Sequence, residues 1–174
     1  RRMEERAFPL DMFIQDVAEN PPVRVPGVSI FMTGTLIGTP LPLLHNVKNN
    51  KVLHKTVVLF HLRTEEVPYV PPKERIKIQV LEQGFRTVTA HYGFMDSPDI
   101  KECLTLCKKK GHDWPDAQTT FFLGHTTVLP SGTAQLATWR KRLYVVMARN
   151  AARATAFLRI PPGRVVEFGV QVEL

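Results

Sequence analysis

The sequence predicts an α/β fold, in which a mixed, partly parallel sheet carries helices packed on it. Residues 27–35 and 56–62 are nearly continuous apolar runs, which are typical of strands buried on both faces. A helical pattern separates them, so an N-terminal βαβ unit is expected. Residues 74–80 alternate between apolar and polar side chains and precede a Gln-Gly turn, which predicts an antiparallel hairpin in the same sheet.

The chain is expected to open with a helix over residues 9–20. Pro9 suits a first helical turn, and the apolar side chains recur at helical spacing. Residues 21–27 must end this helix, because they contain three prolines and a glycine. The strand over 27–35 follows. The predicted inner face of the helix consists of Leu10, Phe13, Ile14 and Val17.

A second helix is predicted after residue 38, where Thr39 can cap it and Pro40 suits its first turn. Asn49 or Asn50 is expected in the left-handed conformation that often ends a helix. The strand over 56–62 comes next. Because the two strands should be parallel, the crossover between them is expected to be right-handed.

The rest of the chain predicts a proline-rich connector, the hairpin, a helix from Ser97 to Gly111, a strand, a long helix and a final alternating strand. Ser97 is expected to cap its helix and Gly111 to terminate it. The remaining ranges are 67–75 for the connector, 85–95 for the second hairpin strand, 119–129 for the next strand, 137–158 for the long helix and 165–174 for the last strand.

The composition favours anionic neighbours. The 174 residues carry a formal net charge of +7, and the basic groups are spread along the chain with acidic residues between them. No aromatic residues interleave with these groups as a base-stacking surface requires, which argues against nucleic acid as a partner. An anionic membrane surface fits this charge balance better.

No enzyme or metal site is predicted. The sequence contains no GxSxG, HExxH or GxxxxGK[ST] motif, so we expect no catalytic residues and no cofactor. Cys103 and Cys107 are spaced i, i+4 on a predicted helix, which fits two small apolar side chains in a reducing compartment. His45, His54 and His61 lie on different predicted elements and do not suggest a metal triad.

Two groups of polar residues are candidate binding sites, for a nucleotide or for another domain. The first is the turn after the strand over 27–35, because ligands of open α/β sheets bind beyond strand carboxyl ends. The second is the polar stretch between the predicted helix and the strand over 56–62. An ordinary turn and an ordinary helix-to-strand connection remain the structural alternatives. The candidates are Thr33, Gly34, Thr35, His45, Asn46, Lys48 and Lys51.

Several long segments together resemble one known family. In chain order they are RVPGVSIFMTG, LLHNVKNNKVLHKTVVLF, VPYVPPKERIKI, YGFMDSPDI, TTFFLGHTTVLP, WRKRLYVVMARNA and PPGRVVEFGVQVEL. This series, from Arg24 to Leu174, resembles the cytoplasmic C-terminal domain of the Kup (KUP/HAK/KT) potassium uptake transporters. The sequence contains no apolar stretch of about 18 residues and begins at Arg1. The chain is therefore expected to be a piece of a longer protein.

The resemblance implies a division into residues 1–23, a helix and linker from the membrane part, and residues 24–174, a cytoplasmic α/β domain. It implies that the parent imports K⁺ by proton symport and that this domain is a non-enzymatic regulatory or scaffolding part at the cytoplasmic face of the inner membrane. Its implied partners are the transmembrane part of the same transporter and a second copy in a homodimer. Because some bacterial members respond to cyclic di-AMP, an alternative is a module that senses a cyclic dinucleotide or an adenine nucleotide.

Overall fold

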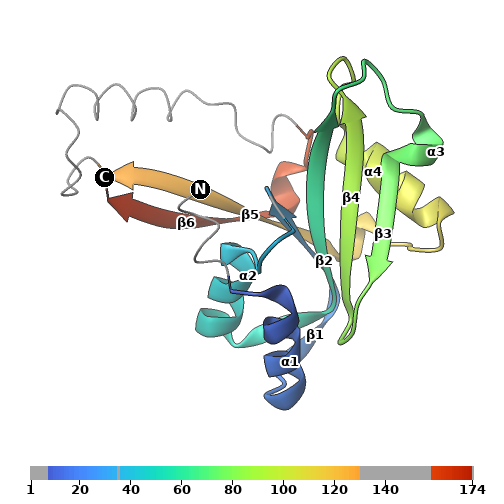
Figure 1. The fold of residues 1–174 in the computed structure, drawn as a ribbon. Coiled ribbons are helices and arrows are strands. Elements are labelled where there is room, and N and C mark those ends of the chain that lie inside the picture. Colours follow the sequence, from blue (N-terminus) through green and yellow to red (C-terminus); the bar gives the residue numbers. More distant parts are fainter. Residues whose placement is uncertain (1–7, 35, 130–157, 174) are drawn as a thin grey trace.

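The described residues form one mixed sheet with helices on both faces (Figure 1). The structure is a computed structural model, and it describes residues 8–34, 36–129 and 158–173. Within them, six strands are arranged in the order β3-β4-β2-β1-β5-β6, and all neighbours are parallel except β3 and β4. The predicted fold class is therefore confirmed. The strands are β1 Val23–Thr33, β2 Val52–Glu65, β3 Ile76–Val80, β4 Phe85–Gly93, β5 Thr119–Leu129 and β6 Val165–Glu173.

Most of the helices connect one strand to the next along the chain, and most of them are short. The helix α2 continues directly into a π-helical turn, η2, and the two together connect β1 to the parallel strand β2. The predicted βαβ unit is thus present. The helices are α1 Leu10–Glu19, α2 Leu41–His45, η2 Asn46–Asn50, α3 Pro72–Arg75, α4 Ile100–Lys109, and the short 3₁₀ turns η3 Asp116–Gln118 and η4 Pro162–Arg164.

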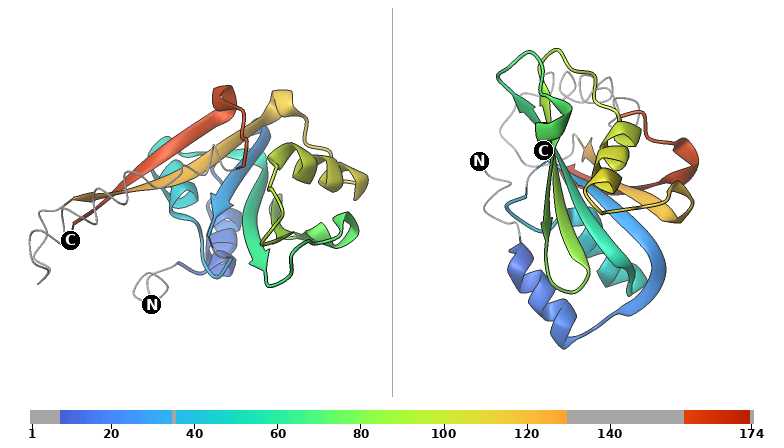
Figure 2. Two further views of the ribbon diagram at one scale, coloured as in Figure 1. Left: turned by 90° about the horizontal axis from the view of Figure 1, so that it is seen from above. Right: turned by 90° about the vertical axis from the view of Figure 1, so that its right-hand side faces the viewer.

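Two hydrophobic cores lie on the two faces of the sheet. Neighbouring residues of a strand point to opposite faces, so Ile30 belongs to the core under α4 whereas Phe31 belongs to the core under α1 and α2. The helices α4 and α1 accordingly cover different faces (Figure 2). The predicted helix over 9–20 is confirmed as α1, and it buries Phe13, Ile14 and Val17 in the second core.

The strands β1 and β2 are longer than predicted. The strand β1 begins at Val23 rather than at residue 27, and its pairing with β2 shifts register between Val25 and Val28. Pro26 lies within this irregularity. A proline has no N–H to donate to a neighbouring strand, so a strand tolerates a proline where the regular pairing is interrupted. The strand β2 extends to Val52 and Glu65, because β1 pairs with its first residues and β4 with its last.

Three predicted helix-terminus residues are wrong. Thr39 does not cap α2: it is buried, and Pro40 occupies the cap position. Ser97 does not cap α4, because the Asp99 side chain accepts a hydrogen bond from Lys101 N at 2.8 Å and its charge suits the positive end of the helix. The left-handed residue is Lys51, with φ of 56°, instead of Asn49 or Asn50.

The other predictions concern the hairpin and the C-terminal half. The hairpin of β3 and β4, the strand β5, and Gly111 beyond the end of α4 are confirmed. The final strand, β6, pairs with β5 in parallel. The long helix predicted over 137–158 falls almost entirely outside the described residues. The domain boundary at residues 23 and 24 stays a prediction.

Gly84 is required by the turn between β3 and β4, and its replacement tests the register of the sheet. Its φ is +79°, and an added Cβ would lie 2.3 Å from the carbonyl oxygen of Lys55 on β2. We expect Gly84→Ala to lower the free energy of unfolding by about 2 kcal/mol or more. Urea unfolding measures this change.

Gly163→Ala is the matched control, because an added Cβ there meets no atom within 4 Å. It should change the free energy of unfolding by no more than about 0.5 kcal/mol. Equal stability of the two variants would contradict the observed approach of the hairpin turn to β2.

Candidate functional site

The predicted turn after β1 lies at the carboxyl edge of the sheet. Thr33 is the last residue of β1, and its carbonyl oxygen accepts a hydrogen bond from His61 Nδ1 at 3.2 Å. Gly34 follows, and an added Cβ there would meet no atom within 4 Å, so space alone does not require a glycine. Thr35 lies outside the described residues.

The second group of predicted residues lies on α2, η2 and the residue that follows. Asn46 is buried, and its Nδ2 donates to Val52 O at 3.2 Å while its Oδ1 accepts from Asn50 Nδ2 at 2.9 Å. Asn46 therefore ties the π-helical turn to the start of β2, which is the structural alternative considered above. His45 is half-buried, and Lys48 and Lys51 are exposed.

The two groups are far apart. Lys51 precedes Val52, which pairs with Val23 at the beginning of β1, whereas Thr33 pairs with His61 at the end of β1. A strand rises about 3.3 Å per residue, so Lys51 and Thr33 are separated by roughly 30 Å. The described members of the predicted set consequently do not come together as one binding site.

The carboxyl edge of β2 and β4 carries a surface that the sequence reasoning did not identify. The loop after β2 and the loop after β4 lie side by side, with Phe94 N donating to Val67 O and Met95 N to Pro68 O, both at 3.0 Å. Four large apolar side chains on these loops are 46–62% exposed. We call them the carboxyl-edge patch: Val67, Tyr69, Phe94 and Met95.

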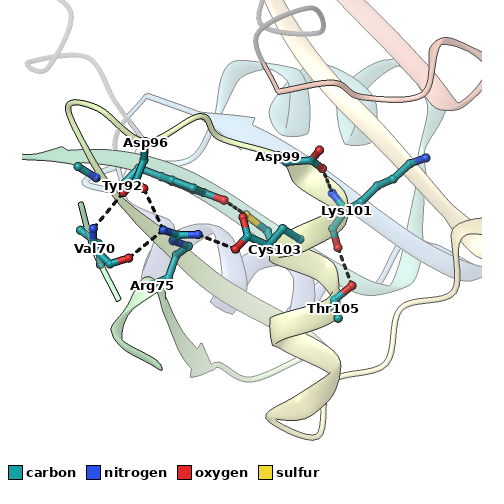
Figure 3. Close-up of polar contacts among 10 residues, drawn as sticks. Val70, Arg75, Tyr92, Asp96, Asp99, Lys101, Cys103 and Thr105 are labelled. Atoms are coloured by element: carbon teal, nitrogen blue, oxygen red, sulfur yellow. Dashed lines mark hydrogen bonds and ion pairs between the residues drawn. The ribbon is translucent and has the colours of Figure 1, made fainter. Parts of the chain in front are cut away.

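The side chain of a buried arginine, Arg75, forms hydrogen bonds with both loops (Figure 3). Arg75 Nη2 donates to Asp96 Oδ1 at 3.1 Å and to Val70 O at 2.8 Å, and Nη1 donates to Glu102 Oε1 at 2.5 Å. Its guanidinium carbon lies 4.7 Å from the centroid of the Tyr92 ring. The side chains of Arg75 and Asp96 are each only 10% exposed. Arg75 therefore joins α3, both loops and α4.

Asp96 fixes the backbone of the two loops. Its Oδ2 accepts from Gly93 N at 2.7 Å and from Val70 N at 3.0 Å. The pKa of Asp96 is lowered, first by the hydrogen bonds from Val70 and Gly93 and then by the charge of Arg75. The carboxylate is thus ionised at neutral pH, and the loops beneath the carboxyl-edge patch are held in one arrangement.

The sequence contained a weak signal for this site. Asp96 lies in a Gly-Phe-Met-Asp-Ser-Pro turn, where an aspartate commonly accepts hydrogen bonds from the local backbone. The alternation over residues 74–80 predicts Arg75 on the polar, solvent-facing side of a hairpin strand, but it is the last residue of α3 and is buried. No local pattern shows that it pairs with Asp96, 21 residues away.

The two cysteines are core residues. Both are free and buried, and Tyr92 Oη lies 3.1 Å from Cys103 Sγ. Burial raises the pKa of Cys103 to about 11 and that of Cys107 to about 12, so both thiols are protonated at neutral pH. Neither is a nucleophile, which agrees with their prediction as small apolar residues.

Within residues 8–34, 36–129 and 158–173, no three His, Cys, Asp or Glu side chains are grouped so that they could hold a metal ion. In the same part of the chain, no helix has both the length and the apolar character needed to cross a bilayer.

Comparison with known proteins gives a consistent picture. The family model described as "K+ potassium transporter C-terminal domain" matches residues 26–174. A protein of Myxococcus xanthus named "Probable potassium transport system protein Kup" is 49% identical over 99% of this chain. "Probable potassium transport system protein Kup 2" of Chromobacterium violaceum is 46% identical over the whole chain.

The match covers only part of these relatives. The chain spans 26% of the Myxococcus xanthus protein and 28% of the Chromobacterium violaceum protein. A third relative, "Probable potassium transport system protein Kup 1" of Paramagnetospirillum magneticum, is 46% identical over the whole chain and is covered to 27%. No solved structure matches the chain.

Replacement of Arg75 tests the support of the carboxyl-edge patch. Arg75→Met should lower the free energy of unfolding, because it leaves the carboxylate of Asp96, which is only 10% exposed, without its charge partner. Arg75→Lys should be intermediate, since an ammonium keeps the charge but lacks the planar fork. Urea unfolding measures the loss, and faster amide exchange at Phe94 and Met95 should accompany it. Wild-type stability in Arg75→Met would contradict this role.

The pH dependence of stability tests the ionisation of Asp96. Its pKa is lowered in the folded state, so its contribution is present above the ordinary Asp pKa of about 3.9 and is lost as pH falls through the lower folded value. The stability difference between the wild-type chain and Asp96→Asn should therefore be largest at neutral pH and shrink in acid. Urea unfolding at a series of pH values measures it. A difference that does not vary with pH would contradict the lowered pKa.

Proposed function

The chain belongs to the family of K+ potassium transporter C-terminal domains, and from this premise we propose that it is the cytoplasmic regulatory and scaffolding domain of a potassium uptake transporter. The supporting observation is that the chain matches the family over residues 26–174 and corresponds to about a quarter of relatives named as potassium transport proteins. In this proposal the parent protein imports K⁺ by proton symport, and the ion pathway lies outside this chain. The domain itself is non-enzymatic.

The carboxyl-edge patch is the surface through which we propose that the domain contacts the membrane part of the same transporter. Aromatic side chains and methionine are enriched at protein interfaces, and Tyr69, Phe94 and Met95 are of these types. The loops that carry them are tied to each other and to Arg75 before any partner binds. Preorganised loops lose less conformational entropy on docking, which favours a stable contact.

Two further expectations from the sequence remain predictions. A homodimer is one of them. The other is the sensing of a cyclic dinucleotide or an adenine nucleotide at the predicted residues. The distance between Thr33 and Lys51 gives no support to a single nucleotide site made from the described members of that set.

Uptake of K⁺ by the full-length transporter tests the proposed contact. In cells that lack other K⁺ uptake systems, Phe94→Asp with Met95→Asp should reduce the uptake rate by roughly tenfold. A charge in the centre of an apolar interface costs binding free energy of hot-spot size. Immunoblotting must show the same amount of transporter in the membrane.

Val80→Asp is the matched control for this experiment. Val80 is 61% exposed, close to the exposure of Phe94, but it ends β3 where that strand pairs with Arg86 at the start of β4, away from the patch. This variant should transport K⁺ at the wild-type rate. Normal uptake and normal regulation in the double patch variant would reject the patch as the contact surface.

A further inference from the structure

A pocket of about 360 Å³ lies at the amino ends of β1, β2 and β4, on the opposite edge of the sheet from the carboxyl-edge patch. We call it the amino-edge pocket. Val28, Thr56 and Arg86 line it from the strands. The loop that follows α4 lines it with His112, Trp114 and Gln118. None of the described residues that the sequence predicts as a binding site lines this pocket.

Among the described residues that line the amino-edge pocket, Arg86 is the one arginine, and few of its N–H donors have a hydrogen-bond partner in that part of the chain. The Nε atom is buried and has no hydrogen-bond partner among the described residues. Nη1 reaches Gly84 O at 3.5 Å, which is long for an N–H···O bond. In the described part of the chain, no carboxylate forms an ion pair with Arg86. A guanidinium is always charged, so a half-buried one without a counterion favours binding of an anion.

The surroundings of Arg86 reinforce a positive potential. Lys55 also lines the pocket. Asp113 is the one carboxylate among the lining residues, and it is paired with Lys108 at 3.1 Å. Lys109 and Lys110 offset the negative end of α4, which points to this edge.

We infer that the amino-edge pocket binds the phosphate group of a small phosphate-bearing molecule, with Arg86 as its principal ligand. A tetrahedral oxyanion can accept from the fork of Arg86 and from the hydroxyl of Thr56, which lines the same floor. The volume lies in the range of small-molecule sites, so a group attached to the phosphate also fits. The half-buried ring of His112, which packs 5.9 Å from Trp114, offers that group a flat surface.

This inference goes beyond the proposed function and does not depend on it. Phosphate binding needs only the fold around Arg86, whereas the proposed docking needs the rest of the transporter. A negative result for phosphate binding therefore does not argue against the proposed docking, and a negative result for docking does not argue against phosphate binding. The same phosphate chemistry is present in soluble metabolites and in lipid head groups, and the experiment has one arm for each source.

In the first arm, isothermal titration calorimetry measures binding of inorganic phosphate, AMP and adenosine to the whole 174-residue chain. Phosphate and AMP should bind and compete with each other, whereas adenosine should not bind. In the second arm, sedimentation measures binding to phosphatidylcholine vesicles with and without phosphatidic acid. Binding in the first arm identifies a soluble ligand, and binding only to vesicles with phosphatidic acid identifies a lipid head group.

Variants decide whether the pocket is responsible. Arg86→Met should weaken binding at least about tenfold, the effect of losing hydrogen bonds to a charged group. Arg63→Met is the matched control, because Arg63 is an exposed arginine on β2 whose partner is Glu65, near the opposite edge. It should bind as the wild-type chain does.

A second variant tests the pocket independently in case Arg86→Met does not fold. Gln118 is exposed on the wall of the pocket, so Gln118→Glu places a carboxylate there with little effect on the core. It should also weaken binding at least about tenfold, since the new charge repels an anion in the same pocket. Absence of binding in both arms, or equal binding by the wild-type chain and the two pocket variants, would overturn the inference.

Discussion

The ion pair between Arg75 and Asp96 is the interaction on which the carboxyl edge of the sheet depends. Each charge is almost fully buried, and burial of an isolated charge is strongly unfavourable. Here the cost is offset because Asp96 also accepts from two backbone N–H groups and Arg75 also donates to Val70 O and Glu102. The pair therefore fixes the two loops that display the carboxyl-edge patch.

The parallel sheet determines where the two surfaces lie. Because β1, β2 and β4 run in the same direction, their carboxyl ends meet at one edge and their amino ends at the other. The carboxyl-edge patch is apolar and is supported by the ion pair of Arg75 with Asp96, whereas the amino-edge pocket contains Arg86, which forms no ion pair with any described residue. The proposed docking surface and the proposed anion site therefore share none of the described residues.

Local patterns predicted most of the fold but not the site. Continuous apolar runs identified β1 and β2, because a strand buried on both faces needs apolar side chains on both. Alternation identified β3, because a strand buried on one face needs them only at every second residue. Helix termini were less predictable: Asp99 was preferred to Ser97, and the π-helical turn moved the left-handed position to Lys51. The site depends on the contacts of Arg75 with Asp96 and Glu102, which follow it by 21 and 27 residues, and side-chain spacing along a chain carries no information about such pairs.

The most direct test of the central claim is hydrogen–deuterium exchange of the patch loops in the full-length transporter and in the 174-residue chain. If the carboxyl-edge patch packs against the membrane part, amide exchange at residues 66–70 and 93–96 should be slower in the full-length transporter. Exchange in the turn around Gly84, on the opposite edge, should be the same in both. Equal exchange of the patch loops in the two proteins would contradict the account.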